Sequence, residues 1–510
     1  MLKEKRQLRR TYQRTRGEGL KTTLNRLTKK ISSEISRIRK EAWASLCSRK
    51  DPSSVRLVWS KIRSINGQEL GSTHRPLKVN DVVYSSKQDI CEVFANSLAK
   101  SFKLELLKLK PDVEAQNFMV QSPEQSPNIP VSITEQELLS SARTLKKSSA
   151  PGFDGITNVQ IVNSLRSKFF IQFLLKIFNE SMYRSEIPVA WKQASVTMIP
   201  KKGKDVSDPS SYRPISLLSC LAKFLEKIIN NRLIKYLEQN NKIPIFQSGF
   251  RKNRSTSDHI LRLTQSVKEG FNQNLLTTAV FFDLAKAFDR TWHQGLVYKL
   301  HQAKCPLYLA RWIEDFLRDR TFRVRVGECV SSERIIEAGV PQGSCLSPTL
   351  FLLYVSDIVE VLEPLSDIKI ALYADDICIW TTKRTKDELR IELQKGIENF
   401  CQRWRLELNV SKTNFCTFTT AGLRNNYEER YSINLFCDKS RILINPHPIF
   451  LGFQLDPKLG FGKLVDDVIK KAHTRLNVLR IPKSKKKKLT TNFFSKFIKV
   501  SSDHSSTITT

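Results

Sequence analysis

The chain has 510 residues, and 40% of them are hydrophobic, which excludes wholesale disorder and allows a sizeable core. It contains 84 Lys and Arg against 50 Asp and Glu, a net charge of +34. So large a surplus favours a polyanionic partner, either nucleic acid or an anionic membrane. The surplus is concentrated at the ends, with a net charge of +12 over residues 1–50 and +9 over residues 461–510.

Cysteine spacing and hydropathy exclude several further classes. The ten cysteines lie far apart and none forms a CxxC pair, which argues against a zinc knuckle or a disulfide framework. The first residues, MLKEKRQLRR, lack the apolar centre of a secretory signal. No run of 18 apolar residues indicates a transmembrane helix. We therefore expect a soluble, intracellular protein without a membrane partner.

Residues 1–106 are expected to form a basic, helical N-terminal region. Apolar residues at three- and four-residue steps predict an amphipathic helix within it. This stripe comprises Leu24, Leu27, Ile31, Ile35 and Ile38. The Lys and Arg residues of the polar face fit two interpretations equally, a solvated surface or a contact with a phosphate backbone.

The rest of the chain divides at proline-rich and charged segments. Residues 107–134 lack periodicity, contain four prolines and are predicted to be a linker. Residues 135–455 are expected to be continuously folded, and a short helical pattern follows over residues 456–482. The KSKKKK run and the Ser/Thr-rich end predict a disordered basic tail over residues 483–510.

The segment AVFFDLAKAFD, residues 279–289, places an acidic residue at the end of an apolar run. The run predicts a buried strand, and Asp283 follows at its C-terminal end. A carboxylate there is costly unless it is paired or binds a metal. The alternative is that Asp283 is only the N-cap of a following helix.

The segment IKIALYADDICIW, residues 368–380, predicts a hairpin. Apolar residues alternate on both sides of Ala374, Asp375 and Asp376, which indicates two short strands and a tight turn. Adjacent carboxylates repel each other, and a divalent cation would compensate them. The alternative is an ordinary polar turn.

The segment GVPQGSCLSPTLFLLYVSDI, residues 339–358, combines a glycine-bounded loop with a helix. Gly339 and Gly343 bracket a Pro-Gln pair, so the backbone can approach a ligand closely. Ser347 fits as a helix N-cap with Pro348 at the first helical position. A well-capped core helix is expected here whether or not the loop binds a ligand.

These three segments, in this order, resemble the palm of reverse transcriptases from non-LTR retrotransposons, in particular the jockey-like group. Further blocks are similar to motifs of that family. They are KSSAPGFDGI (147–156), IPKKGK (199–204), SYRPISLL (211–218), QSGFRKNRST (247–256), ELNVSKT (407–413) and FLGF (450–453). The resemblance covers about residues 140–480 and implies an α+β fold with right-hand polymerase architecture. It implies fingers, a palm with an antiparallel sheet and a partial thumb, with a core domain over about residues 181–455.

The resemblance implies an RNA-directed DNA polymerase that copies retrotransposon RNA into DNA by two-metal nucleotidyl transfer. Its cofactor would be two Mg²⁺ ions, with Mn²⁺ as a substitute, and its partners an RNA template, a DNA primer and dNTPs, in the nucleus and cytoplasm. Members of the group usually carry an endonuclease ahead of the polymerase, a function that would have to come from elsewhere. The thumb-like pattern ends after Arg480. The alternative is therefore a catalytically inactive, truncated product that only binds nucleic acid.

The resemblance also implies the site residues. Asp283, Asp375 and Asp376 would hold the metal ions, and Lys412 would donate a proton to the departing pyrophosphate. The nucleotide would contact Arg213, Lys223, Arg251, Leu284, Phe288, Gln342 and Gly343. The primer grip would comprise Phe450, Leu451 and Gly452. Arg213, Lys223 and Arg251 could instead be ordinary surface residues. Phe288 would lie under the incoming sugar and select deoxyribose, or it could instead be a packing residue of the core.

Overall fold

The computed structural model describes most of the chain between Leu2 and Lys483. The described ranges are 2–15, 18–48, 76–103, 132–201, 203–284, 286–356, 358–362, 367–401, 408–420, 426–437 and 439–483. They belong to two compact units, Met1–Arg75 and Pro76–Thr510. Most of the expected linker and nearly all of the expected tail lie outside the described residues.

The described part of the first unit consists of two helices, in agreement with the helical region expected here. α1 (Leu2–Thr15) and α2 (Glu18–Ser48) pack against each other. Leu24 and Leu27 are half-buried and Ile31 is buried, so the predicted apolar stripe lies on α2. The side chains of Ile35 and Ile38 lie outside the described part of the chain.

Residues 76–103 fold with the second unit, so the boundary expected at residue 106 lies at residue 75 instead. They form the hairpin β1 (Leu77–Val79) and β2 (Val82–Tyr84), followed by helix α4 (Lys87–Ser101). The buried side of α4 packs against two strands of a sheet that begins more than ninety residues later. This cluster includes Ile90, Phe94, Leu98, Ala194, Val196, Phe322 and Val324. The sequence pattern of α4 does not reveal so distant a partner.

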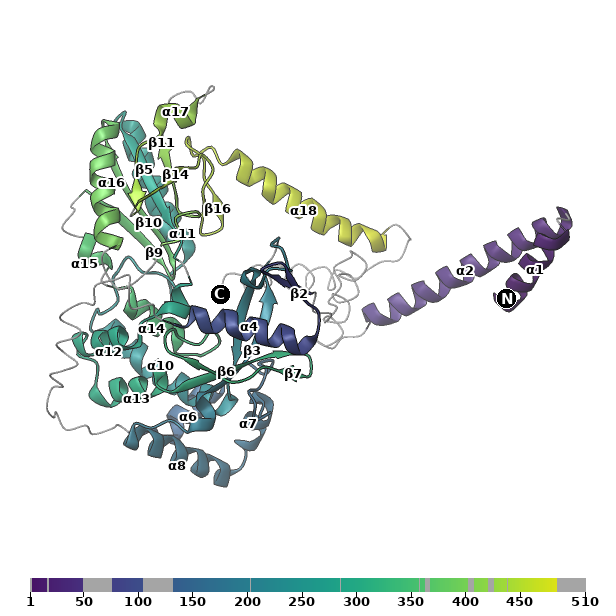
Figure 1. The fold of residues 1–510 in the computed structure, drawn as a ribbon, viewed down its shortest axis with the longest axis horizontal. Coiled ribbons are helices and arrows are strands. Elements are labelled where there is room, and N and C mark those ends of the chain that lie inside the picture. The colour runs from purple at the N-terminus through teal and green to yellow at the C-terminus, as the bar shows by residue number, and fades with distance from the viewer. Residues whose placement is uncertain are drawn as a thin grey trace. The chain divides into compact units, whose positions relative to one another are not determined.

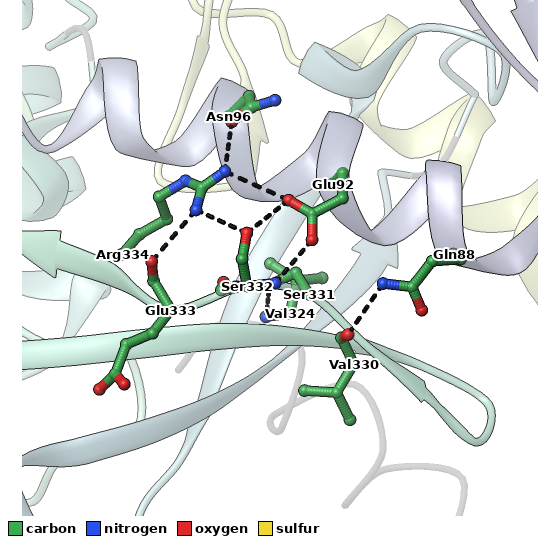
Figure 2. A network of polar contacts seen from close by, with 9 residues as sticks. All are labelled: Gln88, Glu92, Asn96, Val324, Val330, Ser331, Ser332, Glu333 and Arg334. Carbon is green, nitrogen blue, oxygen red and sulfur yellow. Dashed lines mark hydrogen bonds and ion pairs between the residues drawn. The ribbon is translucent and has the colours of Figure 1, made fainter.

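Polar side chains of α4 also form hydrogen bonds with residues 330–334, at the edge of the same sheet (Figure 2). The carboxylate of Glu92 accepts hydrogen bonds from the backbone nitrogen of Ser332 at 2.6 Å and from its hydroxyl at 2.7 Å. Arg334 donates to Glu92 at 3.2 Å and to Asn96 at 3.0 Å. Gln88 donates to the carbonyl of Val330. These contacts fix the rotation of α4 about its axis.

The sheet beneath α4 is called the Arg213 sheet here, after a residue on its edge strand. Its strand order is β4-β3-β6-β7, with β8 paired to β6, and only β3 and β6 run parallel. The strands are β3 (Gln193–Pro200), β4 (Tyr212–Leu217), β6 (Arg320–Val326), β7 (Cys329–Val330) and β8 (Arg334–Ile336).

Further helices of the second unit accompany the Arg213 sheet, and α6, α7 and α8 lie together on one side of it (Figure 1). They are α6 (Glu135–Ala142), α7 (Asn158–Ser164), α8 (Lys168–Arg184), α9 (Val189–Lys192) and α10 (Cys220–Gln239). Ile133 and Thr134, expected in the linker, belong to this folded part. The backbone of Ile133 pairs with the side chain of Asn179, and Thr134 caps α6.

The second sheet is called the Asp283 sheet, because Asp283 follows its central strand. Its order is β14-β11-β5-β10-β9. Three of the four neighbouring strand pairs are antiparallel, but β14 pairs with β11 in parallel, so the sheet is mixed and not purely antiparallel as expected. The strands are β5 (Leu276–Phe282), β9 (Lys369–Tyr373), β10 (Asp376–Lys383), β11 (Asn414–Phe418) and β14 (Leu443–Ile444).

Helices cover both faces of the Asp283 sheet (Figure 1). Because side chains alternate along a strand, β5 sends Val280 and Phe282 to the core shared with α16 (Lys386–Cys401). Its Ala279 and Phe281 pack in a second cluster with α11 (Thr256–Asn272). Burial on both faces explains why the β5 sequence is a nearly continuous apolar run.

The remaining described elements complete the second unit. They are η1 (Pro209–Ser211), η2 (Ala287–Arg290), α12 (His293–Gln302), α13 (Leu307–Leu317), α14 (Ser347–Tyr354), α15 (Ile358–Leu362), α17 (Tyr427–Tyr431), β12 (Phe436–Cys437), β13 (Ser440–Arg441), β15 (Ile449–Phe450), β16 (Phe453–Gln454) and α18 (Gly462–Lys483). The predicted late helix is thus present as α18. Among the described residues, no helix is long and apolar enough to cross a membrane.

The expected N-cap of α14 is wrong by one residue. Leu346 is the N-cap, and Ser347 is the first helical residue, with Pro348 in the first turn. The hydroxyl of Ser344 accepts hydrogen bonds from the backbone nitrogens of Leu346 at 3.0 Å and Ser347 at 3.4 Å. A serine outside the helix thus fulfils the capping role that was expected of Ser347.

Candidate active site

Asp283 stands directly after β5, as its sequence context predicts. Its carbonyl accepts a hydrogen bond from the backbone of Asn409 at 2.8 Å, and its backbone nitrogen donates to the hydroxyl of Thr413 at 3.3 Å. The next helical turn, η2, has Lys286 as its N-cap. The N-cap interpretation of Asp283 is therefore wrong, and its carboxylate is left for another purpose.

The predicted hairpin is formed by β9 and β10. Tyr373 pairs with Asp376 across it, so Ala374 and Asp375 form the two-residue turn. Ala374 has a φ of 56°, in the left-handed region that this tight turn requires. The register also pairs Ile377 with Phe282, which brings Asp376 beside Asp283 on the neighbouring strand.

A separate loop supports the turn from outside. The side-chain oxygen of Gln247 accepts hydrogen bonds from the backbone nitrogens of Ala374 at 3.0 Å and Gly249 at 2.8 Å. A Cβ on Gly249 would lie 2.3 Å from the nitrogen of Ala374, so only glycine permits this approach. The loop from the QSGFRKNRST block therefore fixes the backbone of the acidic turn.

The three carboxylates interact electrostatically. Desolvation, followed by the charges of Asp375 and Asp283, raises the pKa of Asp376 to about 6. Desolvation and the charge of Asp283 also raise the pKa of Asp375, while its own backbone amide and Arg213 lower it. Both side chains remain exposed to solvent, so a cation can reach them. Mutual repulsion of this kind is the arrangement that a divalent cation relieves.

Asp283 is paired with Lys412 in the absence of other cations. Their Nζ and Oδ2 atoms are 2.9 Å apart, and both side chains are well exposed. Within the described ranges, no group of three or more His, Cys, Asp and Glu side chains is already closed around a metal-sized space. The carboxylates are hard oxygen ligands of the type that Mg²⁺ takes, and Lys412 occupies one oxygen, Oδ2, of Asp283.

Four cationic residues, Lys201, Arg213, Lys286 and Lys412, lie close enough to interact with one another, and two of them, Arg213 and Lys412, interact with the acidic centre. Burial, and then the charges of Lys412, Arg213 and Lys286, lower the pKa of Lys201. Arg213 lies on β4 and Lys201 follows β3, so both come from the Arg213 sheet. Lys286 has a φ of 52°, and its ammonium donates to the hydroxyl of Ser101 on α4 at 2.6 Å.

Sequence reasoning selected Arg213 and Lys412 but missed Lys201 and Lys286. Both missed lysines lie inside blocks that resemble family motifs, IPKKGK and AVFFDLAKAFD. The position of Lys201 and Lys286 inside these blocks could have marked them as candidates, but nothing else in the sequence distinguishes them from other lysines.

Two of the expected nucleotide-binding cations are engaged elsewhere. Arg251 forms a two-pronged ion pair with Glu238, at 2.8 and 2.6 Å, and donates to the carbonyls of Pro244 and Gln247. Such a buried guanidinium stabilises the loop that supports the acidic turn. Lys223 on α10 contacts the carbonyl of Ala150 at 3.4 Å.

The PQGS loop, residues 341–344, contacts both the Arg213 sheet and η2. The carbonyl of Gln342 accepts a hydrogen bond from the backbone of Ser216 on β4 at 2.7 Å, and its side-chain nitrogen donates to Asp289 at 2.9 Å. Gly343 has a φ of 132°, and a Cβ there would lie 2.3 Å from the carbonyl oxygen of Ser216. Glycine is therefore required at the closest approach of loop and strand.

Phe288 lies in η2, between the PQGS loop and α14. Its ring stacks on Phe351 with centroids 4.4 Å apart and meets Phe250 edge-on at 6.4 Å. The side chain is only half-buried. The ring is thus supported by the core while one part of it stays accessible, which is compatible with both interpretations of this residue.

The predicted primer-grip residues form a second hairpin. Phe450 ends β15, and Leu451 and Gly452 form the turn with φ values of 50° and 80°. Phe450 is buried against Phe281 of β5, with ring centroids 5.4 Å apart. The hairpin is therefore held on the Asp283 sheet, on the face opposite α16.

Comparison with known proteins gives the family. The family model described as "Reverse transcriptase (RNA-dependent DNA polymerase)" matches residues 199–455, half of the chain. The chain is 34% identical over 410 residues to the "RNA-directed DNA polymerase from mobile element jockey" of Drosophila melanogaster, covering 77% of this chain and 43% of that protein. It is 28% identical to the "Probable RNA-directed DNA polymerase from transposon X-element" of the same species, covering 92% and 51%.

A third relative is the "Probable RNA-directed DNA polymerase from transposon BS" of Drosophila melanogaster, 33% identical over 68% of this chain and 38% of that protein. The chain thus spans about half or less of the length of these curated relatives. The matched region contains all three acidic residues, the PQGS loop and the primer-grip hairpin. The chain belongs to the reverse transcriptase family of RNA-dependent DNA polymerases.

Proposed function

We propose that this chain is the polymerase part of a non-LTR retrotransposon protein and copies element RNA into DNA from a primer 3′ end. The observation that carries the proposal is the set of three coupled carboxylates, Asp283, Asp375 and Asp376, together with the cations Arg213 and Lys412 that interact with them. A DNA polymerase needs both features, because it must hold a triphosphate and stabilise charge on the reacting oxygens. Such an enzyme would act in the nucleus or cytoplasm.

The parts of a right-hand polymerase can be assigned on this basis. The Asp283 sheet with α11 and α16 would be the palm, and the Arg213 sheet with its helices the fingers. α18 would be the start of the thumb, and its exposed Val465, Val468 and Ile469 form an apolar stripe suited to a partner surface. The basic helices α1 and α2 would add sequence-independent affinity for nucleic acid.

Divalent metal ions are general to this family, and the carboxylates here suit two Mg²⁺ ions, with Mn²⁺ as a substitute. Asp283 and Asp375 would hold both ions, Asp376 would support them, and the carbonyl of Leu284 is a further donor. Bound ions would supply charge stabilisation for the attacking and leaving oxygens.

The cations would divide the remaining tasks. Lys201, Arg213 and Lys286 would hold the triphosphate, and arginine is suited to two-pronged phosphate contact. Lys412 would leave Asp283 when the ions enter and then stand near the departing pyrophosphate as a proton donor. Lys223 and Arg251 would support the surrounding loops, while Gln342, Gly343 and Phe288 would line the nucleotide pocket.

Primer extension on an RNA template tests the proposal. The wild type should extend a DNA primer with dNTPs and Mg²⁺, while Asp375→Asn should lose at least about three orders of magnitude in rate, because it removes a charge that acts in the transition state. Asp387→Asn is the matched control, since it removes an exposed carboxylate in the first turn of α16. Extension by Asp375→Asn at the control rate would refute the assignment.

The runner-up function is an inactive product that only binds nucleic acid. The family and the relatives' names describe polymerases, so this alternative receives no support. This alternative would be supported if the wild-type protein bound primer–template but never extended the primer.

A further inference from the structure

One buried carboxyl group near the active site has no part in the proposed chemistry. Asp289 lies in η2 and is 6% exposed. Three cationic groups interact with it electrostatically: Lys286 and Arg290 from its own segment, and Lys201 from the end of β3. Burying a carboxyl group is costly unless hydrogen bonds or ion pairs compensate it, so its partners indicate what it does.

The backbone around Asp289 is held tightly against the PQGS segment. The backbone nitrogen of Gly339 donates to the carbonyl of Thr291, and that of Val340 donates to the carbonyl of Phe288, both at 2.8 Å. The ring of His293 makes a further contact with the carbonyl of Gly339 at 2.7 Å. These backbone contacts hold the η2 segment and the PQGS segment in a fixed relative position, so a contact between their side chains also has a fixed geometry.

Asp289 of the η2 segment and Gln342 of the PQGS segment form a side-chain contact. The Nε2 atom of Gln342 lies 2.9 Å from Oδ1 of Asp289. An ionised carboxylate only accepts hydrogen bonds, so it must face the NH₂ group of the amide and not its oxygen. The Oε1 atom of Gln342 is then directed away from Asp289, and no described residue donates a hydrogen bond to it.

We propose that Asp289 is a positioning residue that fixes the amide of Gln342, so that the amide presents an oxygen acceptor to the incoming nucleotide. The inference rests on the proposed polymerase function and extends it to the selection of substrate. The ligand group is a hydrogen-bond donor of a deoxynucleoside triphosphate. Without Asp289, the amide of Gln342 could rotate by half a turn and present its NH₂ group instead. A hydrogen-bond donor of the nucleotide would then face another donor and form no hydrogen bond.

The electrostatics of the site support this arrangement. Desolvation raises the pKa of Asp289 to about 6, against the opposing effects of the Gln342 hydrogen bond and of Lys286, Lys201 and Arg290. At pH 7.5 the group is therefore ionised and accepts only. A protonated carboxyl group could instead donate to Oε1 and reverse the amide.

A double-mutant cycle tests the inference. Asp289→Asn keeps the shape of the side chain but can hold the amide in either orientation. Gln342→Met keeps most of the bulk and removes the amide. Nucleotide affinity is measured with dideoxy-terminated primer on an RNA template, so that no chemistry follows, and incorporation is measured separately with an extendable primer.

Asp289→Asn should weaken dNTP binding by roughly three- to tenfold, the size of one neutral hydrogen bond, with a smaller change in rate at saturating dNTP. In the Gln342→Met background it should have almost no further effect. Asp315→Asn is the control, because its carboxylate binds Lys192 and the backbone of Ile187, and it should leave affinity unchanged.

Two outcomes would overturn the inference: unchanged affinity in Asp289→Asn, or an equal loss with and without Gln342. Failure of the proposed function looks different. In that case the wild type binds dNTP and primer–template but does not extend, while the cycle still reports on the Asp289–Gln342 contact.

Discussion

The ammonium group of Lys412 lies 2.9 Å from the carboxylate of Asp283, although the two residues are 129 positions apart in the chain. The contact crosses from the end of β5 to the segment before β11. In the proposed mechanism Asp283 holds divalent ions, so Lys412 occupies a place that a metal needs. We therefore expect the lysine to compete with a metal ion for Asp283 and to neutralise part of the negative charge of the acidic centre.

Lys412→Met is expected to bind Mn²⁺ more tightly than the wild type in the absence of nucleotide. The gain should be several-fold, because an exposed ion pair of this kind contributes about 0.2–1 kcal/mol. Isothermal titration or electron paramagnetic resonance of Mn²⁺ measures it. Lys395→Met removes an exposed lysine on α16 as a control. If Lys412→Met binds Mn²⁺ no better than this control, the competition does not exist.

Asp376→Asn is expected to stabilise the metal-free protein at neutral pH. The pKa of Asp376 is raised from 3.8 to about 6, so the folded state holds its proton more tightly than the unfolded state, and stability is lost as pH rises through this window. The variant should gain about 1 kcal/mol at pH 7.5, a discounted value because the side chain is exposed to solvent.

Urea unfolding at several pH values measures this gain, which should shrink as the pH falls from 6 towards 4. Saturating Mg²⁺ should also reduce it, since the ion stabilises only the protein with intact carboxylates. A gain that is independent of both pH and metal would mean that packing, not charge, is responsible.

Phe288→Ala tests whether the ring selects the sugar. A ring under the sugar would exclude a 2′-hydroxyl, which costs about 1–3 kcal/mol when it is buried without a partner. The variant should therefore incorporate rNTPs at least about tenfold better relative to dNTPs. It should also unfold at a lower temperature, because the stacking on Phe351 is lost.

Phe351→Leu is the informative comparison, because it disturbs the same stack from the buried side. If both variants lower the melting temperature but neither changes the rNTP to dNTP ratio, Phe288 is only a packing residue. Single-nucleotide incorporation assays decide the matter.

Removal of residues 1–48 is expected to flatten the salt dependence of nucleic-acid binding. Each phosphate contact contributes a slope of about 0.9 on duplex DNA, or about 0.7 on single strands, in log K against log salt. The two helices carry many exposed Lys and Arg, so the slope should fall by several units. Fluorescence anisotropy at a series of NaCl concentrations measures it, and an unchanged slope would mean that these charges only keep the protein in solution.

Sequence patterns predicted the parts of the site that depend on neighbours in the chain. The apolar run before Asp283 and the alternation around Asp375 and Asp376 specify a strand end and a hairpin, and both are present. Such signals are local, because strand periodicity and turn geometry involve only adjacent residues.

The remaining features depend on contacts between distant segments. The sequence could not indicate that Arg251 pairs with Glu238, that Lys286 reaches Ser101, or that α4 covers the Arg213 sheet. A surface lysine and an active-site lysine look alike until the fold brings other charges to them. The resemblance to a family located the right blocks but did not separate residues that hold the scaffold from those that face the substrate.

The docking of α4 has a practical consequence for dissecting the protein. The segment that defines the family begins at residue 199, whereas the apolar surface of β3 and β6 is closed by a helix that ends at Ser101. A recombinant fragment trimmed to the family boundaries would lack α4. Phe322 and Val324, which α4 covers, would then be exposed to water, and the fragment would tend to aggregate. We therefore expect a stably folded fragment to include α4 and the β1–β2 hairpin, which belong to the compact unit that begins at Pro76, well upstream of the motifs by which the family is recognised.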